Sequence, residues 1–541
     1  MAIIIHRPGE QLTAAAATGV LAHLCYFIHG EHDLMAAGIF RAHLLAAVCL
    51  AYVKRHYEGL TTQQAVTESV ALLAAYAVTL WASIVIFRLF FSPLNSIRGP
   101  LRLRLTKLAH MWGMAHRRNC EILDDLRQEY GDVVRTGPNE VTVFGLDAYN
   151  AVHGPDSQCG RAAYYDIVHP MVSLDTTRDE TIHAYRRKVW DQAFSIKSLE
   201  RATPVIYSRA AELIEQLRKR QNQRLDISTW LEYYTFDVMG LFGLTIDFKN
   251  LTEGEHPILG IYHMAHHLLG PLAAVPWVKH LLMGIPFIER MKHYRRFFSW
   301  AHDELARNIK VKERQNIIGY VLRDAEKNGG VKANWNFVLG DFVLVIIAGS
   351  DPVRQVLANM MYYLIQYPER LAAIREELAA IDIQNYKVLQ YQPLLNAAIY
   401  ETLRLNPAVP SAGLRLPPRG GMVINGTYIP EHTTIVTPQY SLMRDKRYFQ
   451  EPEEWIPERF TTRPELILNK SAFVPWTIAG KKSCLGKNLS LMEIRVAAAM
   501  ILTEFDFAFA PGEDGTQMFT KATDFFTTTP GPLYLALKSR Q

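Results

Sequence analysis

Cysteine is scarce in this sequence, and the few cysteines present form no pattern. They are Cys25, Cys49, Cys120, Cys159 and Cys484, five among 541 residues. The sequence has no CxxC pair and no regular cysteine spacing, which argues against a disulfide framework and against a cysteine-based zinc site. We therefore expect the protein to work in a reducing compartment.

The sequence also lacks any block of like charge. Its formal net charge is +5, and the basic residues alternate with acidic ones instead of forming a stripe, so a nucleic-acid partner is not expected. Internal repeats and low-complexity linkers are absent as well. Residues 99–541 are therefore predicted to form one large, mainly helical domain with a minor sheet component. The segment DVVRTGPNEVTVFG at 132–145 predicts two short strands about a Gly-Pro turn.

Charged residues are missing from SVALLAAYAVTLWASIVIF at 69–87. This stretch has about the length that crosses the hydrocarbon core of a bilayer, and it predicts a transmembrane helix. Two weaker candidates, residues 12–28 and 34–53, precede it and contain histidine or arginine, so amphipathic or re-entrant helices are the alternative for both. We assign residues 1–98 to a membrane anchor of one to three transmembrane helices.

Basic residues follow this anchor. They are Arg88, Arg98, Arg102, Arg104, Lys107, Arg117 and Arg118, with no acid between positions 98 and 118. By the positive-inside rule, the large C-terminal part faces the cytosol. Lys54 and Arg55 would lie on the opposite side if all three segments crossed the membrane, so the sequence leaves the number of spans open.

The segment FVPWTIAGKKSCLGKNL at 473–489 surrounds the last cysteine. Cys484 lies between Gly480 and Gly486, and the strong helix pattern LSLMEIRVAAAMIL follows directly. Cys484 is therefore expected at a helix N-terminus, where backbone N–H groups favour an anionic sulfur. Such a thiolate suits an iron ligand, while a thiol nucleophile or a buried structural cysteine are the alternatives on this segment alone.

This segment resembles the cysteine loop of the cytochrome P450 family, the haem-thiolate monooxygenases. The family loop has a glycine four residues before the cysteine, a basic residue two before and a glycine two after, and Gly480, Lys482 and Gly486 match them. Thr477 stands where the family has an aromatic residue, with Trp476 beside it. The resemblance implies the cytochrome P450 fold, and haem b with Cys484 as the axial ligand of its iron. It further implies haem-binding roles for Gly480, Trp476 and Lys482, although the family's usual residue at the last position is arginine.

Further segments resemble the family in the same order along the chain. YETLR at 400–404 and PERF at 457–460 match the segments that supply a buried structural triad, here Glu401, Arg404 and Arg459. HAYRRKVWDQAFS, which begins at His183, resembles the helix that sets His183 and Arg187 against the haem propionates. GLRLPPRGGMVINGTYIP contains Arg415, which matches a propionate-binding arginine. The resemblance covers roughly residues 100–541.

A threonine is absent where the family's distal helix has one. DFVLVIIAGSDPVRQVLANMMYYL at 341–364 resembles that helix, with Gly349, Ser350, Asp351 and Pro352 at the catalytic positions and proline in place of the threonine. Proline supplies neither hydroxyl nor N–H, and it removes a backbone hydrogen bond to Ala348. We expect the family's kink to be retained and its proton donor to be lost. Asp351, Ser350, an ordered water or a substrate hydroxyl would then supply protons.

The resemblance implies an enzyme that oxidises a lipophilic small molecule by hydroxylation, epoxidation or desaturation. Electrons would come from NADPH through NADPH-cytochrome P450 reductase. The style of the anchor resembles fungal microsomal members, which implies the endoplasmic reticulum membrane, a cytosolic catalytic domain and a role in secondary-metabolite biosynthesis. The alternative, raised by Pro352, is a P450-fold enzyme without normal oxygen activation, such as an isomerase, a dehydratase or a peroxide-rearranging enzyme.

Two surface features bear on partners. Lys481, Lys482 and Lys487 flank the cysteine loop and are either simply solvated or a docking patch for an acidic reductase. The apolar segment 256–286 resembles the family's lid at the substrate entrance, and its composition suits either a lipophilic substrate or packing against a membrane.

Overall fold

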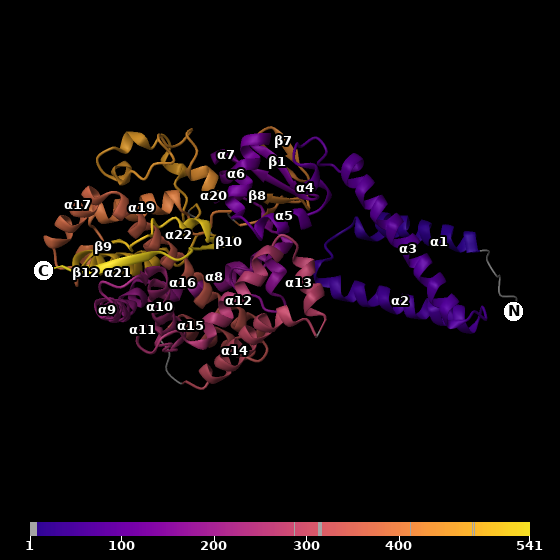
Figure 1. Cartoon of the computed structure of the whole chain (residues 1–541), viewed down its shortest axis with the longest axis horizontal. Coiled ribbons are helices and arrows are strands. Elements are labelled where there is room, and N and C mark those ends of the chain that lie inside the picture. The colour runs from indigo at the N-terminus through magenta and orange to yellow at the C-terminus, as the bar shows by residue number, and fades with distance from the viewer. Residues whose placement is uncertain are drawn as a thin grey trace.

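The computed structural model describes residues 8–285, 287–311, 316–411, 413–478, 480 and 482–540. Figure 1 shows a large helical body, with a three-helix arm projecting from one end. The arm contains α1 (Pro8–Ala22), α2 (Ala36–His56) and α3 (Thr62–Ile86). Short π-helical turns, His23–Phe27 and Phe87–Phe91, extend α1 and α3. Thr61 and Gln64 start α3 with a reciprocal capping box.

Helices dominate the body, as the sequence predicts. They are α4 (Leu101–Leu105), α5 (Leu108–Met114), α6 (Asn119–Tyr130), α7 (Leu146–His153), α8 (Glu180–Ala193), α9 (Ile196–Arg218), α10 (Ile227–Met239), α11 (Asn250–Glu253), α12 (Pro257–Leu272), α13 (Pro276–Met283), α14 (Lys292–Asn308), α15 (Ile317–Lys327), α16 (Trp335–Gln366), α17 (Pro368–Ala379), α18 (Tyr386–Leu389), α19 (Pro393–Leu405), α20 (Gln439–Met443), α21 (Lys487–Glu504) and α22 (Gln517–Thr520).

The minor sheet component consists of one larger sheet and three small ones. The five-stranded sheet has the order β1 (Val133–Gly137), β2 (Glu140–Val143), β8 (Thr434–Val436), β5 (Arg415–Leu416) and β3 (Gly160–Arg161). Its β2–β8 pair is parallel and its other pairs are antiparallel. β4 (Leu225–Asp226), β12 (Tyr534–Ser539) and β9 (Phe505–Phe509) form a second sheet. β6 (Met422–Ile424) with β7 (Thr427–Ile429), and β10 (Thr523–Phe525) with β11 (Thr527–Thr529), form two-stranded ladders. The two strands predicted at 132–145 are β1 and β2.

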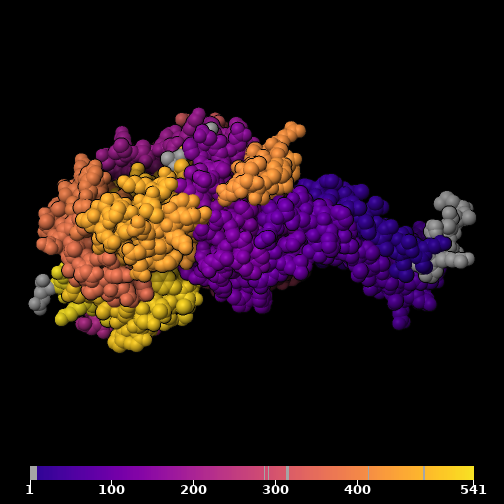
Figure 2. Space-filling view, turned by 90° about the horizontal axis from the view of Figure 1, so that it is seen from above, coloured from indigo at the N-terminus to yellow at the C-terminus, as the bar shows by residue number. Residues whose placement is uncertain are grey.

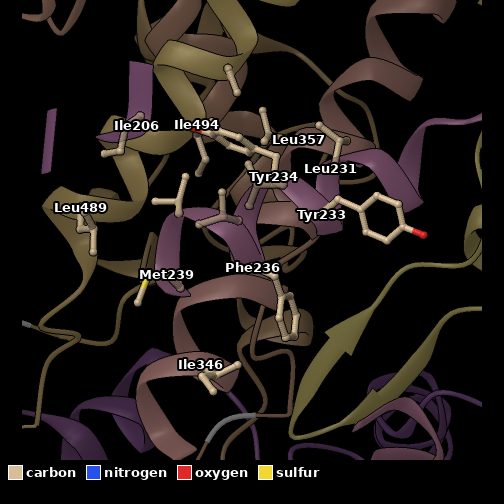
Figure 3. Packing of buried hydrophobic residues seen from close by; sticks show 14 of the residues in the cluster. Ile206, Leu231, Tyr233, Tyr234, Phe236, Met239, Ile346, Leu357, Leu489 and Ile494 are labelled. Carbon is tan, nitrogen blue, oxygen red and sulfur yellow. The ribbon is translucent and has the colours of Figure 1, made fainter. Parts of the chain in front are cut away.

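The main core lies where α16 passes α10, α9 and α21. Figure 3 shows side chains of these four helices packed together, among them Ile206, Tyr234, Ile346, Leu357 and Ile494. α16 is apolar on nearly every side because it is surrounded by other helices.

Three described helices are long and apolar enough to cross a membrane. They are Asp33–His56, with a mean hydropathy of 1.9, Thr62–Phe91, with 2.3, and Trp335–Gln366, with 1.5. The last is α16, and 61% of its apolar window is buried in the body, whereas the other two windows are 0% and 6% buried. The predicted spans 34–53 and 69–87 lie within the first two helices. The third predicted span, 12–28, forms α1 and its π-helical turn, which do not meet these criteria.

Candidate functional site

Cys484 lies directly before α21, in a loop closed by backbone hydrogen bonds. Its N–H donates to the Trp476 carbonyl over 3.1 Å, and Gly486 is the N-cap residue of α21. Burial raises the pKa of the Cys484 thiol, and the Gly486 N–H, Arg187 and the Lys487 N–H only partly counter it. The helix N-terminus and backbone N–H groups expected from the sequence are therefore present beside the sulfur. Because burial outweighs them, a bound metal cation would be needed to hold the sulfur as a thiolate.

Unusual backbone angles shape the cysteine loop. Gly480 has φ +156°, which side chains with a β-carbon rarely adopt. Thr477 has φ +62°, the left-handed conformation, and its hydroxyl donates to the Trp476 carbonyl over 2.6 Å. The Trp476 ring meets Tyr400 and Phe473 edge to face and carries the Lys487 ammonium 4.9 Å from its centroid. A strained threonine thus holds the turn where the family has an aromatic residue.

Cationic side chains gather beside this loop. β3 and β5 pair Arg161 with Arg415 in register, and Lys482 and His183 lie close enough that Arg161 affects the pKa of both. Burial, then the charge of Arg161, lowers the pKa of His183 to about 4. Arg161, His183 and Arg415 are buried. The sequence analysis singled out Arg415, Lys482 and His183. It missed Arg161, because only the pairing of β3 with β5 brings Arg161 to this cluster.

Two guanidinium nitrogens of this cluster have no hydrogen-bond partner in the part of the chain that the structure describes. Arg161 donates one hydrogen bond to the Thr177 carbonyl and Arg415 donates one to the Tyr165 hydroxyl, over 3.0 and 3.1 Å. Among the described residues, neither buried Nε has a hydrogen-bond partner. Lys482 is paired with Glu180 and also donates to the Cys159 carbonyl, both over 2.8 Å. Buried cations without anions are costly, so the cluster fits a ligand that brings carboxylates, as the propionates of haem would.

Arg187 serves the cysteine loop itself. Its Nη1 donates to the Ser483 carbonyl over 2.8 Å, next to Cys484, and its Nε donates to Asp191 over 3.1 Å. The sequence predicts Arg187 against the propionates. In the structure, Arg187 instead contacts the carbonyl of Ser483, the residue before the predicted iron ligand.

Two exposed surfaces, at Cys484 and at Ala348, support the fit to a flat ligand. Cys484 has exposed surface, although the surrounding protein desolvates it. Ala348 is also exposed, in the middle of the otherwise buried α16. Together with the cationic cluster, these surfaces suit haem b, with Cys484 on the iron and Arg161, Arg415 and Lys482 near the propionates. When bound, a haem with a thiolate ligand supplies the chemistry of oxygen activation.

The distal helix stays helical through Pro352, since α16 runs without a break from Trp335 to Gln366. A β-carbon at Gly349 would lie 2.4 Å from Met239 Cε on α10, so the flexible Met239 side chain would have to move to admit one. Ser350 is fully buried, and its hydroxyl has no hydrogen-bond partner among the described residues. The contacts of Gly349 and Ser350 therefore do not indicate a catalytic role for either residue.

Asp351 is buried and held by a tyrosine from another helix. The Tyr262 hydroxyl on α12 donates to Asp351 Oδ2 over 2.5 Å. Oδ1 has no hydrogen-bond partner within the described part of the chain. Burial, then the charge of Glu232, raises the pKa of Asp351 to about 6, against the opposing effects of Arg354 and Tyr262. Asp351 is therefore present in both protonation states near neutral pH.

A network of charged side chains lies beside Tyr262 and Asp351. Glu232 on α10 binds Arg354 on α16 over 2.7 Å and His263 on α12 over 2.6 Å. Burial alone would lower the pKa of His263, but the hydrogen bond and charge of Glu232 raise it overall. The His263 side chain is about one-third exposed, at 32%. Sequence reasoning missed Tyr262, Glu232, Arg354 and His263, because no local pattern shows that these three helices meet.

Glu401, Arg404 and Arg459 form a fully buried ion network. Arg404 binds both Glu401 oxygens over 2.8 Å, and Arg459 Nε binds Glu401 Oε1 over 3.0 Å. The remaining donors are satisfied by backbone carbonyls, for example Arg404 Nη1 by Met443 and Pro452 over 2.7 Å. The arrangement has the geometry expected of a structural triad.

The lysines near the cysteine loop differ in their availability. Lys482 points inward to Glu180 and Cys159. Lys487 is exposed and lies over the Trp476 ring. Lys481 lies outside the described residues. A docking patch for a reductase would therefore depend on Lys487 rather than on Lys482.

The predicted lid segment 256–286 forms α12, α13 and their connection, apart from Pro286, which lies outside the described residues. A cavity of about 50 Å³ lies where this connection faces the five-stranded sheet. Its lining includes Ala273, Ala274, Tyr164 and Phe526. Tyr164 and Phe526 are stacked, with centroids 5.7 Å apart. The lining also includes Lys107, His110, Asn119, Glu140 and Ser411, so the cavity is partly polar.

Comparisons with known proteins agree with this geometry. The family model for cytochrome P450 matches residues 98–537. A cytochrome P450 monooxygenase, orf5, from Eupenicillium brefeldianum is 34% identical over 477 residues, which are 88% of this chain and 97% of that protein. Tryprostatin B 6-hydroxylase from Aspergillus fumigatus is 31% identical over 528 residues, 95% and 94% of the two chains. The crystal structure of the cytochrome P450DA heme domain superposes with a TM-score of 0.68 at 17% identity, and covers 82% of this chain and 98% of that one.

Proposed function

The chain belongs to the cytochrome P450 family and is a haem-dependent monooxygenase of the fungal kind, and on that basis we propose that it oxidises a lipophilic secondary metabolite. The observation that carries the proposal is the buried cationic cluster beside Cys484, in which Arg161 Nε and Arg415 Nε have no hydrogen-bond partner within the described residues. Hydroxylation, epoxidation and desaturation all remain open as the reaction. The related tryprostatin B 6-hydroxylase makes hydroxylation the first reaction to test.

NADPH-cytochrome P450 reductase is the proposed source of electrons, and the endoplasmic reticulum membrane is the proposed location, with the catalytic domain in the cytosol. The apolar α2 and α3 and the basic residues that follow α3 support this orientation. The alternative of an isomerase or a dehydratase has no support from the relatives described above, which are named as monooxygenases or as a hydroxylase.

Asp351 is the proposed proton-holding group in place of the missing threonine. Its Oδ1 makes no hydrogen bond within the described part of the chain, which leaves that atom to water or to a bound substrate. A carboxyl with a pKa of about 6 can both hold and release a proton near neutral pH. Tyr262 fixes the other oxygen and is a positioning residue.

The test uses membranes that contain the full-length protein and a partner reductase. They are incubated with extracts of a strain that lacks the gene, with and without NADPH, and products are read by mass spectrometry. We expect a product that requires NADPH and that has gained oxygen or lost two hydrogens. A Cys484→Ala variant should give none. Product formed equally well without NADPH would refute oxidative turnover.

A further inference from the structure

The three N-terminal helices pack side by side, and their contacts define the direction of each relative to the others. Lys54 at the end of α2 meets Gln11 of α1 and Glu68 of α3, each over 2.8 Å. Farther along, His23 bonds Ser83 over 2.8 Å, while His43 bonds Tyr76 over 2.9 Å. α1 therefore runs parallel to α3, and α2 runs antiparallel to both. Figures 1 and 2 show this bundle projecting away from the catalytic body.

The bundle is polar inside and apolar outside. Its helix-to-helix contacts include the His23–Ser83 and His43–Tyr76 hydrogen bonds. Its outer surface carries large apolar side chains that are more than half exposed: Leu44, Leu45, Val48, Val70, Val78 and Trp81. This distribution is the reverse of that in a water-soluble bundle and is typical of helices surrounded by lipid.

α1 is bound to α3 by close backbone contact. A β-carbon on Gly19 would lie 2.3 Å from both Thr79 Oγ1 and the Tyr76 carbonyl oxygen. Thr79 also donates to the Ala16 carbonyl over 2.8 Å. Small residues that let two helix backbones approach are the common device of helix packing in membranes. Hydropathy alone does not select α1 as a span, but α1 lies against the part of α3 that would cross.

The dimensions fit a crossing by all three helices, and the charge of Lys54, although not that of the exposed Arg55, is neutralised within the bundle. Pro8–Phe27 is about 30 Å long at ~1.5 Å per residue, which equals the thickness of a hydrocarbon core. Lys54, which is 1% exposed, is neutralised by Glu58 and Glu68. Arg41 is exposed in the second turn of α2, at the end near the catalytic body, where a long side chain reaches the interface.

The connection between α1 and α2 is attached to the catalytic body. Glu31 forms a two-pronged ion pair with Arg178, over 2.6 and 2.8 Å. Asp33 accepts from the Trp277 N–H at the start of α13 over 3.1 Å. This connection must therefore lie on the same side of the membrane as the catalytic domain.

We propose that α1, α2 and α3 cross the membrane together as one bundle, with α1 held in place by α3. The N-terminus and the connection between α2 and α3 then lie on the opposite side from the catalytic domain. This topology goes beyond the proposed reaction and does not depend on it.

Glycan acceptor sites report the topology in microsomes. Single acceptors in flexible linkers are placed before Met1, after Gly30, after Gly59 or after Gln541 of the full-length chain. We expect modification at the first and third positions and none at the others. The unaltered chain should stay unmodified, although its exposed Asn425 and Asn469 are themselves acceptor sequences.

Any other pattern of glycan modification refutes the proposal and indicates a different topology. Modification after Gly59 alone means two spans, with α1 outside the membrane. Modification before Met1, after Gly30 and after Gly59 means a single span by α3. The absence of modification at all positions means that the bundle does not cross.

A substitution tests whether α3 holds α1 in the membrane. Gly19→Leu would place a side chain against Thr79 and Tyr76, and we expect it to remove the N-terminal modification from much of the protein while the modification after Gly59 remains. Gly38→Leu is the matched control, because nothing lies within 4 Å of a β-carbon there. Full N-terminal modification of Gly19→Leu would show that α1 inserts independently and would refute its dependence on α3.

Discussion

Replacing Tyr262 by phenylalanine removes one hydrogen bond from Asp351 and leaves the packing of the ring. The lost bond, 2.5 Å long, runs to Asp351 Oδ2 and favours the ionised carboxyl. A hydrogen bond to a charged group contributes about 1.5–3 kcal/mol. The pKa of Asp351, about 6 with the bond present, should therefore rise in Tyr262→Phe, because the carboxylate loses its stabilising donor.

The sign of the effect on stability follows from this direction. A buried carboxyl with a raised pKa makes the folded state lose stability as pH rises from its unfolded pKa, about 4, to its folded pKa. Near pH 5 Asp351 is mostly protonated in both proteins, and near pH 8 it is mostly ionised in the parent. Tyr262→Phe should thus cost about 1.5–3 kcal/mol at pH 8, where the bond runs to an ionised carboxyl, and about 0.5–1.5 kcal/mol at pH 5, where it runs to a neutral one.

The assay is urea unfolding of the solubilised haem protein at the two pH values, followed by haem absorbance. Tyr207→Phe is the control, since it loses a 2.7 Å hydrogen bond to the Ile383 carbonyl, so its cost should not depend on pH. In an Asp351→Asn background the pH-dependent cost of Tyr262→Phe should vanish. An equal cost at both pH values in the parent background would show that Tyr262 does not stabilise an ionised Asp351.

Four further predictions concern the haem site and its support. Cys484→Ala should abolish the thiolate-type absorbance of the carbon monoxide complex, and retention of that band would sink the assignment of the ligand. Arg161→Met should raise the rate at which haem is lost to an acceptor protein, whereas an unchanged rate would separate Arg161 from the propionates. Glu401→Gln should destabilise the fold by about 3–5 kcal/mol by leaving buried arginine charge unpaired, while Arg463→Leu, about half exposed, should cost little in the same unfolding assay. Pro352→Thr should give similar turnover or less peroxide per NADPH consumed, and a complete loss of product would contradict a simple missing donor.

Local patterns were sufficient for part of this structure. The glycines around Cys484 and the helix pattern behind it predicted a cysteine directly before a helix, which is where the structure has it. The alternating residues at 132–145 predicted β1 and β2. Each of these features depends on residues close together in the sequence, so periodicity and turn chemistry are enough to find them.

Other parts depend on tertiary packing and left no local signal. Tyr262 and Asp351 are 89 positions apart, and nothing near either residue shows that α12 and α16 meet. Arg161 reaches the cationic cluster only because β3 pairs with β5. Hydropathy has the same limitation, since it selects both α3 and α16 as long apolar helices. Only burial distinguishes the helix in the core from the one whose apolar side chains face outward.

A buried polar atom without a hydrogen-bond partner indicates the candidate site only where its side chain also keeps its charge. Glu401, Arg404 and Arg459 have partners for their charges inside the fold, as structural ions require. Glu493 on α21 is buried with both oxygens unpartnered among the described residues, but burial raises its pKa well above the ordinary value, which favours the neutral form and lowers the cost of burial. Arg161 and Arg415 cannot lose their charge so easily. Two buried guanidiniums whose Nε atoms find no partner among the described residues, beside an exposed cysteine at a helix start, are therefore a stronger sign of an anionic ligand than any single unpartnered atom.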